Sequence, residues 1–143
     1  MEKLGRLIGI DVGTKRVGIA RTDLLRTSAN SVDTYAPDEA INQIEEMATE
    51  NGPIVGFVVG WPLTPGGYEA DATHMVEKYL HKLKKRFPDI PVHLVDERFS
   101  SKNAVKTMIE SGVPRKKRHQ RGRIDQAAAA LILQQFLETS SDV

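Results

Sequence analysis

The stretch from residue 9 to residue 20 has the sequence Gly9-Ile10-Asp11-Val12-Gly13-Thr14-Lys15-Arg16-Val17-Gly18-Ile19-Ala20. It contains an apolar run, an acid, a glycine turn and a second apolar run, which predicts two strands, over residues 7–10 and 17–20, joined by a turn. Asp11 stands where the first buried strand ends. A buried carboxylate is costly unless it is hydrogen-bonded, paired with a cation or bound to a metal. Asp11 therefore either accepts hydrogen bonds from its own turn, at Gly13 or Thr14, or has a functional role.

The composition indicates one compact domain. The chain has 143 residues, of which 40% are hydrophobic and 6% aromatic, so its core is mainly aliphatic. It contains no cysteine, which excludes disulfides, cysteine-bound zinc and a cysteine nucleophile. Since no apolar run could span a membrane and the first residues do not resemble a signal peptide, we expect a cytoplasmic protein without a membrane partner. We expect the domain to cover residues 1–138, with a frayed tail over 139–143.

The net charge of +1 hides a strong asymmetry. Six of the twenty basic residues lie within residues 115–123, which contain no acid. The other fourteen basic residues stand against nineteen acids, so the remainder of the chain carries a net charge of −5. A dense basic segment on an otherwise acidic protein favours a polyanionic partner, although a solvated loop has the same composition.

Seven further elements follow the first two strands. Helices are indicated by apolar residues at helical spacing with flanking proline, glycine or serine, and strands by short apolar runs between turn residues. The expected elements are a strand over 28–35, a helix from Pro37 that ends at 51–53, a strand over 54–60, a helix over 68–87, a strand over 91–95, a helix from Ser100 or Ser101 to 111, and a last helix that follows residues 122–125. The apolar stripe of that last helix comprises Ala127, Ala128, Leu131, Ile132 and Phe136.

The order of these elements predicts an α/β fold. Strands that alternate with helices are parallel and are joined by right-handed crossovers, whereas the first three strands form an antiparallel meander. We therefore expect a mixed five-stranded sheet with helices on both faces. The strand over 54–60 is almost wholly apolar, which is typical of a central strand covered on both sides.

Three acids fall near one edge of this sheet. Asp11 ends the first strand, Glu97 follows the last strand after Asp96, and Asp125 is expected to begin the last helix. Active crevices of open α/β sheets form at the carboxyl ends of parallel strands. If the first and last strands lie side by side and run the same way, Asp11 and Glu97 meet at this edge. Asp125 joins them if the last helix starts there.

Three converging carboxylates repel one another unless protons or cations neutralise them. Mg²⁺ prefers a few carboxylates together with waters and phosphate oxygens. Two such ions about 4 Å apart activate a water and stabilise the leaving oxygen of a phosphodiester. The basic segment would hold the flanking phosphates. The acids and the basic segment therefore indicate the same substrate class, a nucleic acid.

Each acid also has a plain structural alternative. Glu97 could pair with Arg98 or another cation, and Asp125 could stabilise a helix start through the helix dipole. Asp96 competes with Glu97, because consecutive residues of a strand point to opposite faces. His119 is a candidate for phosphate contact or proton transfer, against a solvated role.

Four blocks of sequence, taken together, resemble one family. They are residues 9–20, Val59-Gly60-Trp61-Pro62-Leu63, Asp96-Glu97-Arg98-Phe99-Ser100-Ser101 with Ala104, and Ile124-Asp125-Gln126-Ala127-Ala128-Ala129-Ala130-Leu131-Ile132-Leu133. Their order and spacing are similar to the YqgF-type family of Holliday junction resolvase-like proteins, also described as pre-16S rRNA nucleases. The resemblance covers nearly the whole chain and implies an RNase H-like fold. The sequence departs from the family pattern at Trp61, where a smaller apolar residue is common.

The resemblance implies a divalent-metal nuclease that trims the 5′ end of the 16S rRNA precursor. Its catalytic residues would be Asp11, Glu97 and Asp125, with Mg²⁺ or Mn²⁺ bound to the same three acids. The resemblance favours Glu97 over Asp96. A monomer or a homodimer is compatible with this role. The residues expected to bind the nucleic acid are Lys15, Arg16, Arg98, Arg115, Lys116, Lys117, Arg118, Arg121 and Arg123.

Three other functions stay open from the sequence. A resolvase of branched DNA would use the same chemistry on another substrate. A non-catalytic RNA-binding module would use the basic segment alone. An ATP-binding protein is suggested by residues 11–14, which also resemble the first phosphate loop of the actin and sugar-kinase superfamily. The chain lacks the second glycine-rich phosphate turn which that superfamily needs.

Overall fold

The described part of the chain contains five strands and three helices. The computed structural model describes residues 4–62, 71–96 and 121–140, with side chains within 4–62, 73–96 and 128–139. In chain order the elements are β1 (Arg6–Val12), β2 (Val17–Thr22), β3 (Ala29–Tyr35), α1 (Pro37–Glu50), β4 (Ile54–Trp61), α2 (Asp71–Arg86), β5 (Val92–Asp96) and α5 (Arg121–Ser140). The helix predicted up to residue 111 lies outside the described residues.

The strands form one sheet in the order β3-β2-β1-β4-β5. β1, β2 and β3 pair antiparallel, whereas β4 is parallel to both β1 and β5. The predicted mixed sheet with an antiparallel meander is therefore confirmed. The first and last strands run the same way but do not lie side by side, because β4 separates them, so that part of the condition for bringing Asp11 and Glu97 together is not met. β4 is the more apolar strand and takes the position that is covered on both sides, while the shorter β5 takes the edge.

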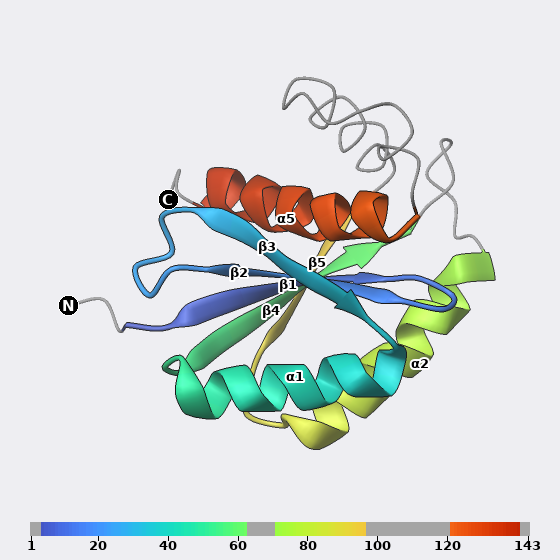
Figure 1. Ribbon diagram of the computed structural model, residues 1–143, viewed down its shortest axis with the longest axis horizontal. Helices are drawn as coiled ribbons and strands as arrows, with labels where there is room; N and C mark the ends of the chain where they lie inside the picture. The colour runs from blue at the N-terminus through green and yellow to red at the C-terminus, as the bar shows by residue number, and fades with distance from the viewer. Residues whose placement is uncertain (1–3, 63–70, 97–120, 141–143) are drawn as a thin grey trace.

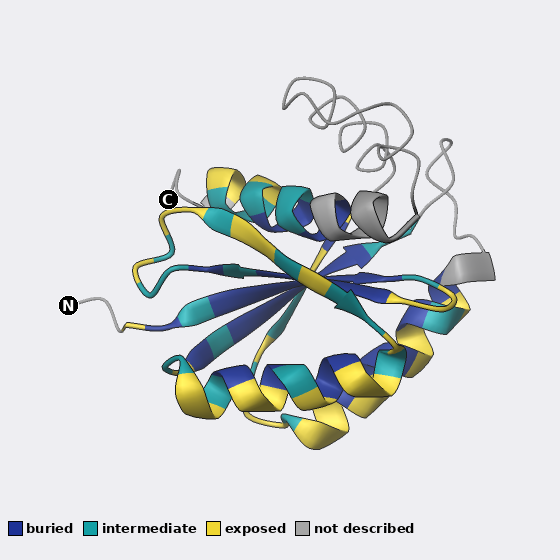
Figure 2. Cartoon of the chain, viewed as in Figure 1, coloured by how far each residue is buried: buried dark blue, intermediate teal, exposed yellow. Residues whose placement is uncertain are grey.

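The sheet is covered on both faces, with α1 and α2 on one side and α5 on the other (Figure 1). The α1/α2 face holds the larger core, in which Phe57, Ile8, Ile10, Ile44 and Leu83 are fully buried. The α5 face holds a smaller core made of Leu7, Ala20, Val58, Val95, Ala129, Ile132 and Leu133. Burial is concentrated in the inner strands, and the outer surfaces of α1 and α2 are exposed (Figure 2).

The sequence determines both ends of α1. Pro37 stands in the first turn, where its missing N–H costs no helical hydrogen bond. After the helix, Asn51 donates its backbone N–H to the Met47 carbonyl, and Gly52 adopts a φ of 89° that glycine tolerates without strain.

Among the described residues, no helix is both long enough and apolar enough to cross a membrane.

α5 begins earlier than the sequence predicted. Its first residue is Arg121, so Asp125 lies in the second turn and the first turn carries no acid. The expectation that Asp125 begins this helix is therefore wrong, as is the alternative that it stabilises the helix start through the dipole, because that effect is confined to the first turn. Arginine is a good helix former, and the single Gly122 costs only about 1 kcal/mol, so the basic end of the loop joins the helix. At its other end α5 continues through Ser140, two residues beyond the expected boundary at 138.

Candidate functional site

Three parallel strands end at the same edge of the sheet. Ile10 of β1 pairs with Val59 of β4, and Trp61 of β4 pairs with Asp96 of β5, the last residue of that strand. The carboxyl ends of β1, β4 and β5 therefore lie in one row. This is the position at which open α/β sheets form their active crevices.

Asp11 lies on the α5 face of this row and is only 8% exposed. Leu7 shares its side of β1 and packs in the α5 core, whereas Ile10 and Val12 pack in the α1/α2 core. Strand alternation therefore directs the Asp11 side chain toward the α5 face. The carboxylate is held at the rim of the sheet in a largely buried position.

Glycines surround Asp11 on this face. Gly9 precedes it by two residues on β1, and Gly18 pairs directly with it on β2. On β4, Gly60 follows Val59, the partner of Ile10, and so stands level with Asp11. The strands on both sides of the carboxylate therefore present backbone at its level. The sequence did not single out Gly18 or Gly60, although glycine within a strand signals a close approach by another group.

α5 starts at the same edge as the turn between β1 and β2 and runs back across the sheet (Figure 1). It approaches β1 closely, because a Cβ placed on Gly9 would lie 2.8 Å from the Ala129 carbonyl oxygen. Both acids lie toward the edge from this contact between Gly9 and Ala129. Asp125 is one helical turn before Ala129, and Asp11 is two strand residues beyond Gly9. One turn advances about 5.4 Å and two strand residues about 6.6 Å. The backbone therefore brings positions 11 and 125 toward the same part of the edge.

Asp96 lies on the other face of the sheet. His93 stacks against Phe136 of α5 with ring centroids 4.8 Å apart, and Val95 packs in the α5 core. Val92 packs against the α1/α2 core, so the even positions of β5 face away from α5. Asp96 is exposed and shares that parity. Of the two neighbouring acids, Asp96 is therefore not on the Asp11 face.

The turn between β1 and β2 presents two basic residues at this edge. Gly13 donates its backbone N–H to the Arg16 carbonyl at 2.8 Å and closes the turn. Lys15 and Arg16 are both exposed there, as expected for residues that contact a charged partner. The remaining predicted site residues lie outside the described side chains, namely Glu97, Arg98, Arg115, Lys116, Lys117, Arg118, His119, Arg121, Arg123 and Asp125.

The donor chemistry at this edge suits a hard divalent cation. The Asp11 carboxylate offers oxygen ligands, which Mg²⁺ and Mn²⁺ prefer. Within the described side chains, which include Asp11 alone of the three predicted acids, no group of three histidine, aspartate or glutamate residues could hold a metal ion.

Comparison with known proteins assigns the family. A family model described as RuvX: Holliday junction resolvase matches residues 5–139. The chain belongs to the RuvX family. A relative from Salinibacter ruber is 46% identical over 132 residues, which cover 92% of each chain. Another from Chlorobium phaeobacteroides is 42% identical over 137 residues, 96% of this chain and 94% of its own. Both carry the name "Putative pre-16S rRNA nuclease".

Solved structures agree with this RuvX-family assignment in their fold. RuvC of Thermus thermophilus in complex with Holliday junction substrate has a TM-score of 0.58 at 14% identity, covering 96% of this chain and 97% of its own. The large terminase nuclease of the thermophilic phage G20c has a TM-score of 0.52 at 10% identity, covering 89% and 81%. The fold is RNase H-like, as the sequence resemblance implied.

Proposed function

We propose that this RuvX-family protein is a divalent-metal-dependent nuclease that processes the 5′ end of the 16S rRNA precursor. The observation that carries the proposal is Asp11, a largely buried carboxylate on the α5 face where three parallel strands end. The relatives' shared name supplies the substrate, pre-16S rRNA. Cleavage of a branched DNA junction is the second candidate, favoured by the family description and by the Holliday junction substrate in the RuvC complex.

Asp11, Glu97 and Asp125 are the residues proposed to hold the metal. Asp11 supplies a carboxylate that is already desolvated and fixed by its strand. Glu97 follows Asp96 directly, and continued strand alternation would give it the parity of Val95, which packs on the α5 side. Asp125 belongs to the end of α5 that lies at this edge. When bound, Mg²⁺ or Mn²⁺ supplies charge stabilisation and activation of water for attack on a phosphodiester.

The basic residues are proposed to hold the nucleic acid beside the acids. Lys15 and Arg16 project from the turn that follows Asp11. Arg98 and the basic residues within 115–123 would contact further phosphates. Because each neutralised phosphate releases counterions, binding should weaken steeply as salt concentration rises.

The test compares two substrates under three metal conditions. Purified protein is incubated with a 5′ precursor segment of 16S rRNA or with a four-way DNA junction, each in Mg²⁺, Mn²⁺ or EDTA. We expect cleavage of the RNA in either metal and none in EDTA. Faster cleavage of the junction would indicate that the substrate is branched DNA and not the RNA precursor. Binding of RNA without cleavage under any condition would instead favour the non-catalytic module.

A further inference from the structure

A concave site opens at the same edge, on the α1/α2 face. It is a pocket of about 370 Å³ between the β1–β2 turn, the start of α1 and one side of α2. The residues that line it are Val12, Gly13, Thr14, Pro37, Met75, Lys78, Tyr79 and Lys82. Val12 directly follows Asp11 but packs on the opposite face of the sheet. The pocket and the proposed active site are therefore neighbours across the end of β1.

The pocket has an apolar wall and a basic side. Val12 and Tyr79 are buried and Met75 is half-buried, so these residues form an apolar wall. Lys78 and Lys82 are exposed and stand one helical turn apart on α2, which places both ammonium groups on one side of the pocket. An apolar wall beside two cations suits a flat apolar group that carries an anion. A nucleic-acid base with its phosphate has this character.

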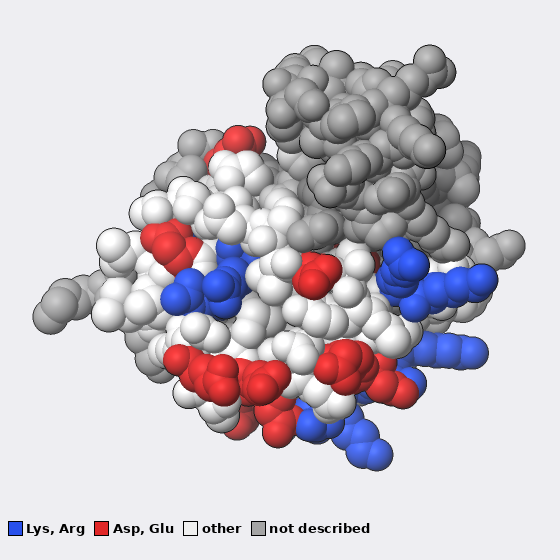
Figure 3. Space-filling model, viewed as in Figure 1, with Lys and Arg blue, Asp and Glu red and all other residues white. Residues whose placement is uncertain are grey.

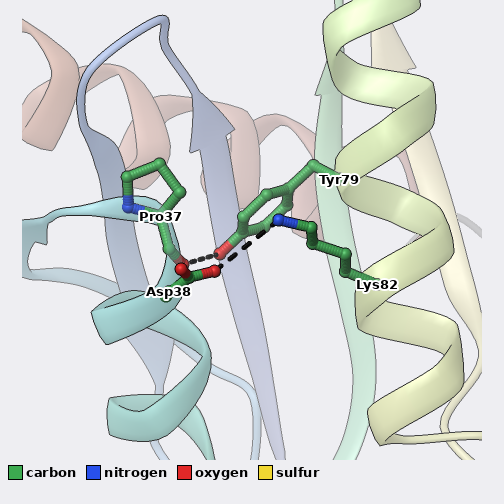
Figure 4. A network of polar contacts seen from close by, with 4 residues as sticks. All are labelled: Pro37, Asp38, Tyr79 and Lys82. Carbon is green, nitrogen blue, oxygen red and sulfur yellow. Dashed lines mark hydrogen bonds and ion pairs between the residues drawn. The ribbon is translucent and has the colours of Figure 1, made fainter.

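A hydrogen bond joins two residues of the pocket lining that come from different helices. The Tyr79 hydroxyl donates to the Pro37 carbonyl at 2.9 Å and ties α2 to the first turn of α1 (Figure 4). Burial raises the pKa of Tyr79 well above its ordinary value, so the hydroxyl stays a donor at neutral pH. Lys82 also lies 3.6 Å from Asp38, but both side chains are largely exposed. Such a pair is weak, so Lys82 can turn toward a phosphate at little cost.

The surface around the pocket has a matching charge distribution. Basic side chains gather where the β1–β2 turn and α2 meet, whereas acidic side chains lie over α1 (Figure 3). Lys15 and Arg16 are exposed in the turn that follows Asp11, and Gly13 and Thr14 of the same turn line the pocket. A polyanionic strand could follow these cations around the turn from one site to the other.

We infer that the pocket holds an unpaired nucleotide of the substrate strand, with its base against Val12, Met75 and Tyr79 and its phosphate at Lys78 and Lys82. This inference rests on the proposed nuclease function, because it places the nucleotide beside the strand segment that is cut. It makes the protein selective for substrates with a single-stranded segment next to the cleavage position. A fully paired duplex would first have to unpair and unstack a base before that base could enter the pocket, which costs a few kcal/mol.

Methionine methyl groups report on this pocket directly. Of the chain's four methionines, Met75 lines the pocket, while Met47 is buried on α1 away from it. The Asp11→Asn protein, labelled at its methionine methyl groups, is titrated with a short single-stranded oligouridine RNA and followed by NMR. We expect a saturable shift of the Met75 signal with little change at Met47. A blunt RNA duplex should leave Met75 unshifted.

Two matched double variants separate the pocket from general charge attraction. Lys78→Ala with Lys82→Ala should weaken oligouridine binding at least about tenfold, because hydrogen bonds to charged groups are lost. Lys84→Ala with Lys85→Ala removes the same charge from exposed positions of the same helix outside the pocket, and should change binding less than about threefold.

An unmoved Met75 signal at saturating RNA, or equal weakening by the two double variants, overturns the inference. If wild-type protein still cleaves RNA in that case, only the inference about the pocket is rejected, and the nuclease proposal stands. If Met75 shifts as expected while the wild-type protein cleaves nothing, the pocket is supported and the nuclease proposal fails.

Discussion

The face of the sheet that packs against α1 and α2 carries large side chains, whereas the α5 face carries glycine and alanine around Asp11. On the first face, Phe57, Ile8 and Ile10 are fully buried in a continuous core. On the second, Gly9 lies against the α5 backbone. Large side chains bury the apolar area that stabilises the fold. Gly9 lets α5 approach the strand closely. The larger core thus lies on the first face, whereas the proposed chemistry lies at the edge of the second, beside a smaller core that includes Leu7, Ile132 and Leu133.

Phe57→Ala should produce the largest change in stability. Phe57 is fully buried and packs edge-to-face on Phe87, with ring centroids 5.5 Å apart. Truncation leaves a cavity and should lower the free energy of unfolding by about 3–5 kcal/mol. Denaturant unfolding measures the loss. Cleavage by the fraction that remains folded at low temperature should be nearly normal. Loss of cleavage in fully folded protein would contradict the division between the faces.

Gly9→Ala should have a smaller effect on stability but should reach the site. Its new Cβ would lie 2.8 Å from the Ala129 carbonyl oxygen and 3.0 Å from the Leu133 Cβ, so α5 must move. We expect a loss of about 1–3 kcal/mol in denaturant unfolding, with slower cleavage because α5 carries Asp125.

Gly56→Ala is the matched control for Gly9→Ala. The nearest atom to its new Cβ is the Leu7 Cδ2 at 2.8 Å, the end of a flexible side chain. This variant should unfold within about 1 kcal/mol of wild type, since alanine also restricts the unfolded chain. Equal effects of the two substitutions would show that close approach of α5 is not what Gly9 provides.

Tyr79→Phe should have the smallest effect. It removes the hydrogen bond to the Pro37 carbonyl but keeps the buried ring. The expected loss is about 0.5–1.5 kcal/mol in the free energy of unfolding. Cleavage of a short RNA that does not reach the α1/α2 face should be unchanged. A loss of cleavage on such a substrate would show that Tyr79 affects the catalytic face, contrary to the difference between the two faces described above.

The sequence predicted most of the fold because local signals agreed with it. The apolar run of β4 correctly indicated a strand covered on both faces, and Pro37 correctly indicated the start of α1. The neighbours of β5 could not be predicted, because strand order depends on which strand takes the buried centre. The sheet-facing side of α5 was also misjudged. Ala129 and Leu133 are buried there, although the expected stripe omitted both. Residues 127–133 of α5 are all apolar, so their pattern could not show which side of the helix faces the sheet.

The candidate site was predictable in part. Asp11 could be identified because an acid at the end of a buried strand is costly unless it is hydrogen-bonded, paired or bound to a metal. The sequence could not show that Gly18 and Gly60 flank it, since this follows from the register of three strands. It could not reveal the pocket on the other face either. That pocket unites residues from the β1–β2 turn, α1 and α2, which only tertiary packing brings together.

The central claim is that the acid on the α5 face acts in cleavage and the acid on the opposite face does not. Asp11→Asn and Asp96→Asn remove one charge each from the same edge of the sheet. Single-turnover cleavage of the RNA precursor segment in Mg²⁺ tests the claim, with folding and RNA binding checked for both variants.

Asp11→Asn should bind RNA nearly normally but cleave it at least about a hundredfold more slowly, because several kcal/mol of transition-state stabilisation is lost. Asp96→Asn should cleave within about threefold of wild type, as expected for an exposed residue away from the reacting groups. Normal metal-dependent cleavage by Asp11→Asn, or equal losses in the two variants, would contradict the account.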